Sequence, residues 1–186
     1  MDDVAAQAEI SKGTIYLYFE SKEAILAHLL LEGLDALLVQ MEAVYRPDSD
    51  QSPEVALRAV ANAYLQFCQS HPNDFRLQMA FDRGRFEEAI PHELYQEVLD
   101  KSLHGLGLVI DAIRRGQEAG VFAPGDPRRT AGVCWAALNG VLVLMGHPMR
   151  RRMVGTDVQS MFEATLDLLI KGLRLEQAPI KQEVDS

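Results

Sequence analysis

The sequence has few of the residues that build disulfide scaffolds and metal centres. It contains two cysteines, Cys68 and Cys134, among 186 residues. Two cysteines so far apart make neither a disulfide scaffold nor a structural zinc site. A di-iron helical bundle requires a glutamate three positions before a histidine, and none of the five histidines has one. We therefore expect no metal and no other cofactor.

Motifs that carry catalysis are also missing. The sequence has no nucleophile elbow, no phosphate-binding loop and no zinc-ligand spacing. Asp100 and His104 are four positions apart, a spacing that allows a surface pair on a helix, but they lack the third partner of a catalytic site. We therefore expect that the chain is not an enzyme.

Positive charge is scarce. The chain has 18 lysines and arginines against 27 acidic residues, a formal net charge of −9, and its pI is about 5.0. This balance argues against non-specific binding to nucleic acid or to a membrane surface. We find no apolar run of membrane-spanning length and no signal peptide at the start. These features predict a cytoplasmic protein without a membrane partner.

The sequence is rich in helical periodicity. With 48% hydrophobic residues it can form a sizeable core, and its apolar residues recur every three or four positions without strand alternation. The predicted fold is all-α. The expected helices after the first 20 residues are 22–45, 53–70, a shorter one ending near 82, 92–119, 127–145 and 156–175.

The first 20 residues fit a helix-turn-helix, in which one helix crosses the DNA backbone and the next enters the major groove. Ala5 and Ala8 are small enough to let the two helices pack closely. Ser11 and Ser21 stand where helix N-caps belong. The apolar residues expected to hold the pair together are Val4, Ile10, Ile15 and Phe19.

The second of these helices carries residue types suited to DNA. Hydroxyl groups contact phosphates or base edges, lysines displace counterions, and a glycine in the first turn leaves room for a phosphate near the free amides. The predicted DNA-binding residues are Ser11, Lys12, Gly13, Thr14, Tyr16, Tyr18 and Lys22.

This segment closely resembles the TetR family of bacterial transcriptional regulators. The family pattern A-x-x-A-G-V-S-x-G-T-L/I-Y-x-Y-F-x-S/N-K-E-x-L is matched in register by Ala5, Ala8, Ser11, Gly13, Thr14, Ile15, Tyr16, Tyr18, Phe19, Ser21, Lys22 and Glu23, and the resemblance is strong over roughly the first 45 residues. The resemblance implies a homodimer that binds a near-palindromic DNA operator, usually as a repressor, and that a small ligand releases. It also implies two domains: a DNA-binding domain with its linking helix at 1–46, and a helical effector-binding and dimerisation domain at 47–186.

Two departures from the family pattern stand out. Glu9 occupies the turn where the family usually has glycine, so we expect a positive φ there at a cost of about 1–3 kcal/mol. The family's first helix does not precede the motif in this sequence, so we expect the DNA-binding domain to be N-terminally incomplete, most simply because the start was assigned too late. Residues 1–46 also carry three cations against eight acidic residues, a formal charge of −5.

The last two long helices have the apolar faces of a dimer surface. Two such helices from each of two chains make a four-helix bundle, which is the usual TetR dimer interface. The predicted interface residues are Leu138, Leu142, Met161, Phe162 and Leu169. The alternative is that these side chains are simply buried within their own chain.

A pocket for a small, largely apolar effector is a further hypothesis. The predicted lining residues are Tyr64, Phe67, Phe75, Gln78, Met79, Tyr95, His104, Trp135 and Asn139; the alternative for each is an ordinary core position. The segments 71–77 and 135–140 resemble those of one TetR subgroup, in which a histidine stands where this chain has Asn139. An amide there can donate and accept but cannot titrate.

The predicted function is therefore a DNA-binding, ligand-responsive transcriptional repressor. The alternative is a dimeric helical ligand sensor or interaction protein without effective DNA binding, because the DNA-binding domain is expected to be incomplete and is acidic.

Overall fold

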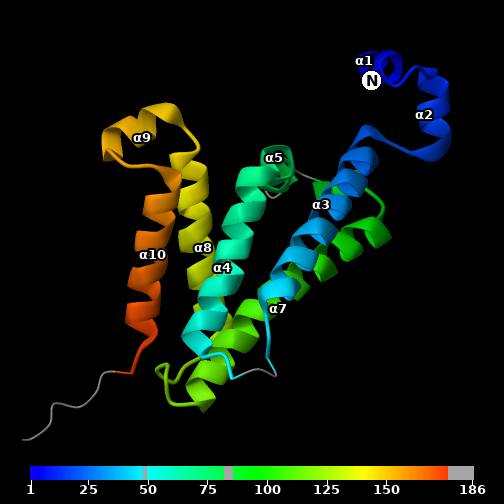
Figure 1. The fold of residues 1–186 in the computed structure, drawn as a ribbon. Helices are drawn as coiled ribbons and strands as arrows, with labels where there is room; N and C mark the ends of the chain where they lie inside the picture. Colours follow the sequence, from blue (N-terminus) through cyan, green and yellow to red (C-terminus); the bar gives the residue numbers. More distant parts are fainter. Residues whose placement is uncertain (48–49, 82–85, 176–186) are drawn as a thin grey trace, which may run out of the picture. The chain divides into compact units, whose positions relative to one another are not determined.

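The structure, a computed structural model, describes residues 1–47, 50–81 and 86–175. Every regular element in these ranges is a helix (Figure 1), which confirms the predicted all-α fold. The helices are α1 (Asp2–Gln7), α2 (Lys12–Tyr18), α3 (Lys22–Val44), α4 (Pro53–Ser70), α5 (Pro72–Phe81), α6 (Phe86–Ala89), α7 (His92–Glu118), α8 (Pro127–Met145), α9 (Pro148–Val154) and α10 (Val158–Leu173).

Polar caps set the helix starts that the sequence predicted. The Ser21 hydroxyl accepts a hydrogen bond from the amide of Ala24 at 3.0 Å, so α3 begins at Lys22. The Asp126 carboxylate accepts from the amide of Arg128 at 2.9 Å, and a proline in the first turn of α8 follows it. Both arrangements satisfy amides that have no partner within the helix.

Helix α9 was not predicted from the sequence. We expected a break at 146–148 and a helix starting near 156, but α9 begins at Pro148. Proline is favoured in the first turn because its missing N–H would have no helical partner there. His147 caps the helix by accepting from the amide of Met149 at 3.3 Å, and Gly155 ends it at φ 76°.

The chain divides into two compact units. The first comprises residues 1–45 and 62–108, and the second comprises 46–61 and 109–186. Helices α4 and α7 each contribute one part to each unit. The first unit therefore holds more of the chain than the predicted domain 1–46.

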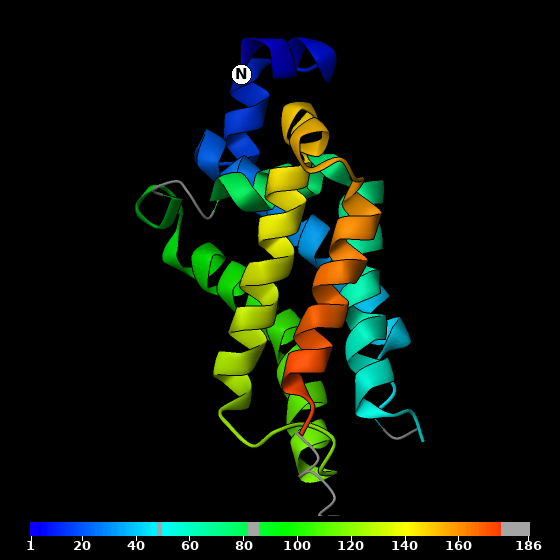
Figure 2. The same ribbon diagram turned by 90° about the vertical axis from the view of Figure 1, so that its left-hand side faces the viewer.

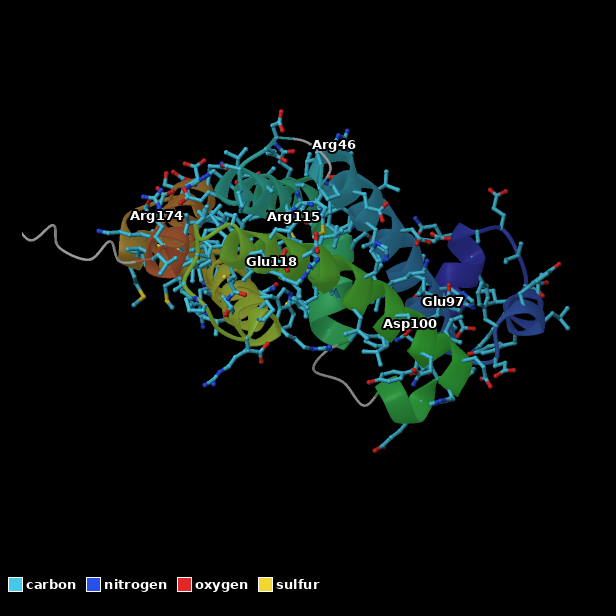
Figure 3. The ribbon with its side chains drawn as sticks, turned by 90° about the horizontal axis from the view of Figure 1, so that it is seen from below. Arg46, Glu97, Asp100, Arg115, Glu118 and Arg174 are labelled. Atoms are coloured by element: carbon cyan, nitrogen blue, oxygen red, sulfur yellow. The ribbon has the colours of Figure 1, made fainter. Side chains whose placement is uncertain are left out.

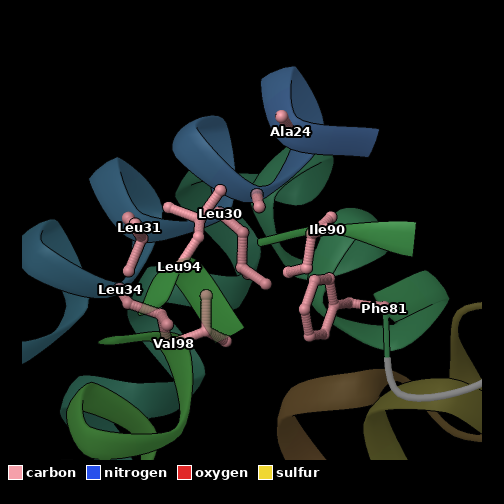
Figure 4. Packing of buried hydrophobic residues seen from close by; sticks show 9 residues of the cluster. Ala24, Leu30, Leu31, Leu34, Phe81, Ile90, Leu94 and Val98 are labelled. Carbon is pink, nitrogen blue, oxygen red and sulfur yellow. The ribbon is translucent and has the colours of Figure 1, made fainter. Parts of the chain in front are cut away.

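The core of the first unit forms around α3 (Figure 4). Its buried members are Ala24, Ala27, Leu30, Leu31, Leu34, Phe81, Ile90, Leu94 and Val98. Helix α5 also packs on α3, and Gly33 permits the close approach. A Cβ at Gly33 would lie 3.2 Å from that of Asp74, closer than most side chains allow.

The second unit is built on the pair α8 and α10, which lie side by side in Figures 1 and 2. Phe162, Leu166 and Ile170 recur every four residues on α10 and are buried. Phe122 is also buried, and it lies so close to Gly116 that a Cβ there would come within 2.0 Å of its ring. Glycine is thus required by packing at position 116.

Helix α3 is more apolar than predicted from the sequence. Among the described residues it is the one single helix whose length and composition alone would allow it to cross a membrane. Helices α8 and α9 together would also be long and apolar enough, if the 106° bend between them were ignored. The prediction that no apolar run reaches that length was therefore wrong. Core helices of soluble proteins pass the same test, and α3 contributes five residues to the core of the first unit.

Candidate DNA-binding site

Helices α1 and α2 pack through a very small core. Ala5 and Ile15 are 5% and 6% exposed, and the amide of Ile10 donates to the carbonyl of Ala5 at 3.0 Å, closing the turn between the helices. Glu9, in that turn, has φ 56°. The positive φ predicted at Glu9 is therefore confirmed, and a residue with a side chain pays the cost of the left-handed conformation there.

The start of α2 is held by two hydroxyl groups. Ser11 Oγ accepts from the amide of Thr14 at 3.0 Å, which confirms the predicted N-cap. The two hydroxyl oxygens, Ser11 Oγ and Thr14 Oγ1, are 2.8 Å apart. One hydroxyl hydrogen is shared between them, so the other can point to an acceptor outside the protein.

Gly13 is not required by the packing of the chain. A Cβ placed there would meet Ser11 Oγ at 3.6 Å, an ordinary contact, and nothing closer. The space beside it opens to the exterior of α2, where Gly13 is exposed. This is the geometry expected if the glycine serves the approach of an outside group such as a phosphate.

The outward face of α2 is aromatic and apolar. Tyr16 and Tyr18 are 44% and 79% exposed, while Thr14 is half-buried. Leu17, which is not among the predicted DNA-binding residues, is 83% exposed. Its position between the two tyrosines on the same short helix was the signal that could have identified it.

Two lysines flank this face. Lys22 is exposed in the first turn of α3. Lys12 is engaged within the protein, because its Nζ lies 3.1 Å from Asp2 Oδ1 and donates to Oδ2 at 3.2 Å. This hydrogen bond, helped by the lysine charge, holds the pKa of the Asp2 carboxyl below its usual value. Sequence reasoning missed the pair because the two residues are ten positions apart on different helices.

The predicted effector-pocket residues are divided between the two units. Tyr64, Phe67, Phe75, Gln78, Met79, Tyr95 and His104 belong to the first unit, whereas Trp135 and Asn139 belong to the second. Three of these residues, Tyr64, Phe67 and Asn139, are buried, and Trp135 is 46% exposed. The half-buried ones are Phe75, Gln78, Met79 and Tyr95. His104 is exposed, with its Nε2 2.7 Å from Glu42 Oε1, so it could anchor an effector only if that pair separated.

The predicted dimer residues differ in accessibility. Phe162, Leu138 and Leu142 are at most 7% exposed, so they pack inside their own chain. Met161 and Leu169 are half-buried. The large apolar side chains that α8 and α10 do expose are Val133, Trp135, Leu144 and Leu168.

Comparison with known proteins agrees with this arrangement. The description "Bacterial regulatory proteins, tetR family" matches residues 1–29, and "Tetracyclin repressor-like, C-terminal domain" matches residues 57–169. The HTH-type transcriptional regulator EthR of Mycobacterium tuberculosis is 31% identical over 114 residues, which cover 61% of this chain and 51% of EthR. The chain thus spans about half the length of the curated relatives it matches.

Solved structures share the fold. PfmR of Thermus thermophilus, a TetR family transcriptional regulator, has a TM-score of 0.72 at 22% identity, covering 94% of this chain and 88% of its own. FadR of Bacillus subtilis, solved in complex with stearoyl-CoA, has a TM-score of 0.71 at 20% identity, with coverages of 92% and 87%. Because a family description matches more than half of its length and its first helices have helix-turn-helix geometry, the chain belongs to the TetR family of bacterial regulatory proteins.

Proposed function

We propose that the chain is a DNA-binding transcriptional regulator that acts as a ligand-responsive repressor. The observation that carries the proposal is α2 itself, a helix capped by Ser11 whose outward face exposes Tyr16 and Tyr18 beside Lys22. A helix in this position would enter the major groove, with hydroxyl groups and lysines contacting phosphates and base edges. A regulator of transcription acts on the chromosome, so the inferred location is the cytoplasm.

The chain would act as a homodimer on a near-palindromic operator. Support comes from the second unit, where α8 turns a buried face towards α10 and exposes Val133 and Leu144, and where α10 exposes Leu168. A second copy would cover these outer faces and complete a four-helix bundle. The interface would then consist of exposed residues together with the half-buried Met161 and Leu169, rather than Phe162.

The effector would be small and largely apolar. The residues that support a pocket are the aromatic and sulfur-containing side chains of α4, α5 and α7, among them Tyr64, Phe75 and Met79. FadR of Bacillus subtilis, which shares the fold, was solved with stearoyl-CoA, a ligand with a long apolar tail. An effector of this type would bind by apolar contact with a few polar anchors such as Gln78.

A second candidate function is a dimeric ligand sensor or interaction protein that does not bind DNA. It is favoured by one specific observation, the ion pair that occupies Lys12 with Asp2 in a segment of charge −5. If this pair persists, fewer cations are left to displace counterions from DNA.

The proposal is tested by replacing Lys22 with alanine and measuring DNA affinity at several salt concentrations. If Lys22 contacts a phosphate, binding weakens on all sequences and the slope of log K against log salt flattens by about one. Lys171→Ala is the matched control, because Lys171 is also exposed but lies near the end of α10. An unchanged slope for Lys22→Ala, or an equal effect of Lys171→Ala, would count against the site.

A further inference from the structure

A cavity of about 320 Å³ lies within the first unit. It is lined by the residues that end α2, by the first turns of α3 and by the beginning of α7. None of the predicted effector-pocket residues contributes to it. It is therefore a separate candidate site, and it contacts Tyr18 of the candidate DNA-binding helix.

The floor of this cavity is apolar. Leu94 and Ala24, which line it, are 9% and 4% exposed and belong to the core of the first unit. Phe19 is half-buried, and its ring meets that of His28 edge to face at a centroid distance of 5.5 Å. The floor thus offers aromatic and aliphatic surface to the apolar part of a ligand.

The rim of the cavity is acidic. Glu20, Glu93 and Glu97 all line it, and Figure 3 shows the position of Glu97 on α7. Glu97 lies 3.9 Å from Lys101, which also bonds to Asp35. Among the ion pairs of the described residues, none includes Glu20 or Glu93. At Glu20 and Glu93 the rim therefore carries negative charge that no ion pair within the described ranges balances.

These carboxylates are not arranged to bind a metal ion. Within the described part of the chain, no three histidine, cysteine, aspartate or glutamate side chains come close enough together to hold one. Spread-out carboxylates beside aromatic rings suit a larger, diffuse positive charge, which is attracted both by the anions and by the faces of the rings.

We propose that this cavity binds an organic cation, an amine or quaternary ammonium compound with an apolar body. The positive group would lie between Glu20 and Glu93, and the apolar part would lie against Phe19 and Leu94. Because the ligand would contact both the end of α2 and the start of α7, it would tie the candidate DNA-binding helix to the rest of the first unit. Binding itself requires no DNA, so it can be tested independently of the proposed function.

The test uses benzyltrimethylammonium, a small aromatic quaternary ammonium ion, and calorimetric titration of the full chain. We expect one ion to bind per chain, with an affinity that falls as salt is added. Benzenesulfonate, a similar ring with the opposite charge, should not bind. In a ¹⁵N spectrum the amide shifts caused by benzyltrimethylammonium should be confined to residues around Phe19, Ala24 and Leu94.

Paired variants make the test specific. Glu20→Gln combined with Glu93→Gln should weaken binding by about threefold to tenfold, since each exposed charge contact is worth up to about a factor of five. Asp100→Asn is the control, because Asp100 is an exposed acid on the same helix (Figure 3) that does not line the cavity. An unchanged thermal midpoint for the double variant would show that it folds.

Three results would overturn the proposal. One is the absence of benzyltrimethylammonium binding at millimolar concentration. Another is equal binding of benzenesulfonate, which would indicate a merely apolar hollow. The third is an equal loss of affinity in Asp100→Asn and in the double variant, which would indicate a general effect of the acidic surface.

Discussion

At the scale of single residues, the turn between α1 and α2 carries a local strain that the sequence makes visible. Glu9 has φ 56°, a conformation that glycine adopts readily and other residues do not. The turn persists because hydrogen bonds close it on both sides, from the amide of Glu9 to Ala6 and from that of Ile10 to Ala5. The strain thus falls in the small element that positions α2.

Glu9→Gly should therefore stabilise this turn. We expect a gain of about 0.5–1 kcal/mol, which is the relief of left-handed strain less the greater chain entropy of glycine in the unfolded state. Slower hydrogen exchange of the Ile10 amide would report it. Glu9→Ala removes the same charge but keeps the strained φ, so an equal slowing in that variant would refute the backbone explanation.

Asp2 limits the availability of the Lys12 ammonium group for DNA. Their ion pair is exposed, with side-chain exposures of 50% for Lys12 and 81% for Asp2, so it exchanges readily with other partners. A DNA phosphate would compete with Asp2 for the same ammonium group.

We predict that Asp2→Asn raises DNA affinity about twofold to fivefold, because it frees Lys12 and removes a negative charge near the phosphates. The affinity should be measured at fixed salt on one DNA fragment. Asp3→Asn removes the same charge from the neighbouring exposed position. If both substitutions raise the affinity equally, net charge and not the Asp2–Lys12 pair is responsible.

At the scale of elements, a bidentate ion pair fastens the end of α10 to the start of α4 within the second unit. Arg174 Nε and Nη2 donate to the two carboxylate oxygens of Glu54 at 2.6 and 2.7 Å. The backbone of Arg174 also pairs with that of Phe122 in an isolated β-bridge. Arg174 is labelled in Figure 3, at the end of α10. The hydrogen bonds from Arg174 lower the pKa of Glu54.

This pair makes a pH-dependent contribution to stability. Since the pKa of Glu54 is lower in the folded state, the contribution is present above the unfolded pKa of about 4.3 and is lost as the pH falls through the folded value. Glu54→Gln should lower the thermal midpoint by about 1–3 °C at pH 7 and by less at pH 4. Glu32→Gln, at an exposed position of α3, should change it little at either pH. A deficit for Glu54→Gln that grows towards pH 4 would contradict the assignment.

Some elements follow directly from the sequence and others do not. The starts of α2, α3 and α8 were predictable because Ser11, Ser21 and Asp126 satisfy helix amides through short-range contacts. Helix α9 was missed because glycine, histidine and proline in succession are also typical of a break, and only the packed chain shows that the proline begins a new helix.

At the scale of the whole molecule, the limit of sequence reasoning was the direction in which each helix face points. Helix α8 is apolar nearly all round, so periodicity alone could not show that Leu138 faces inward and Val133 outward. The candidate DNA-binding residues rest on a dense local motif and stay a prediction. The cavity beside Tyr18 was not, because residues about 70 positions apart line it.

The exposed apolar faces of α8 and α10 predict that the dimer depends on Leu168, which is 72% exposed. Leu168→Asp should raise the dimer dissociation constant at least about 100-fold, because it places a charge twice in the buried interface of a symmetric pair. Analytical ultracentrifugation would measure it. Val39→Asp is the control, since Val39 is 66% exposed on α3. A dimer that survives Leu168→Asp would place the interface elsewhere.

The central claim is that this TetR-family chain reads DNA sequence as a dimer. Selection of bound fragments from a random DNA pool with the purified chain, followed by footprinting of the enriched sequence, tests it most directly. We predict enrichment of a near-palindromic sequence, protected over two half-sites about one helical turn apart. An intact dimer that enriches no sequence and shows no salt-sensitive binding would contradict the claim and favour the ligand sensor.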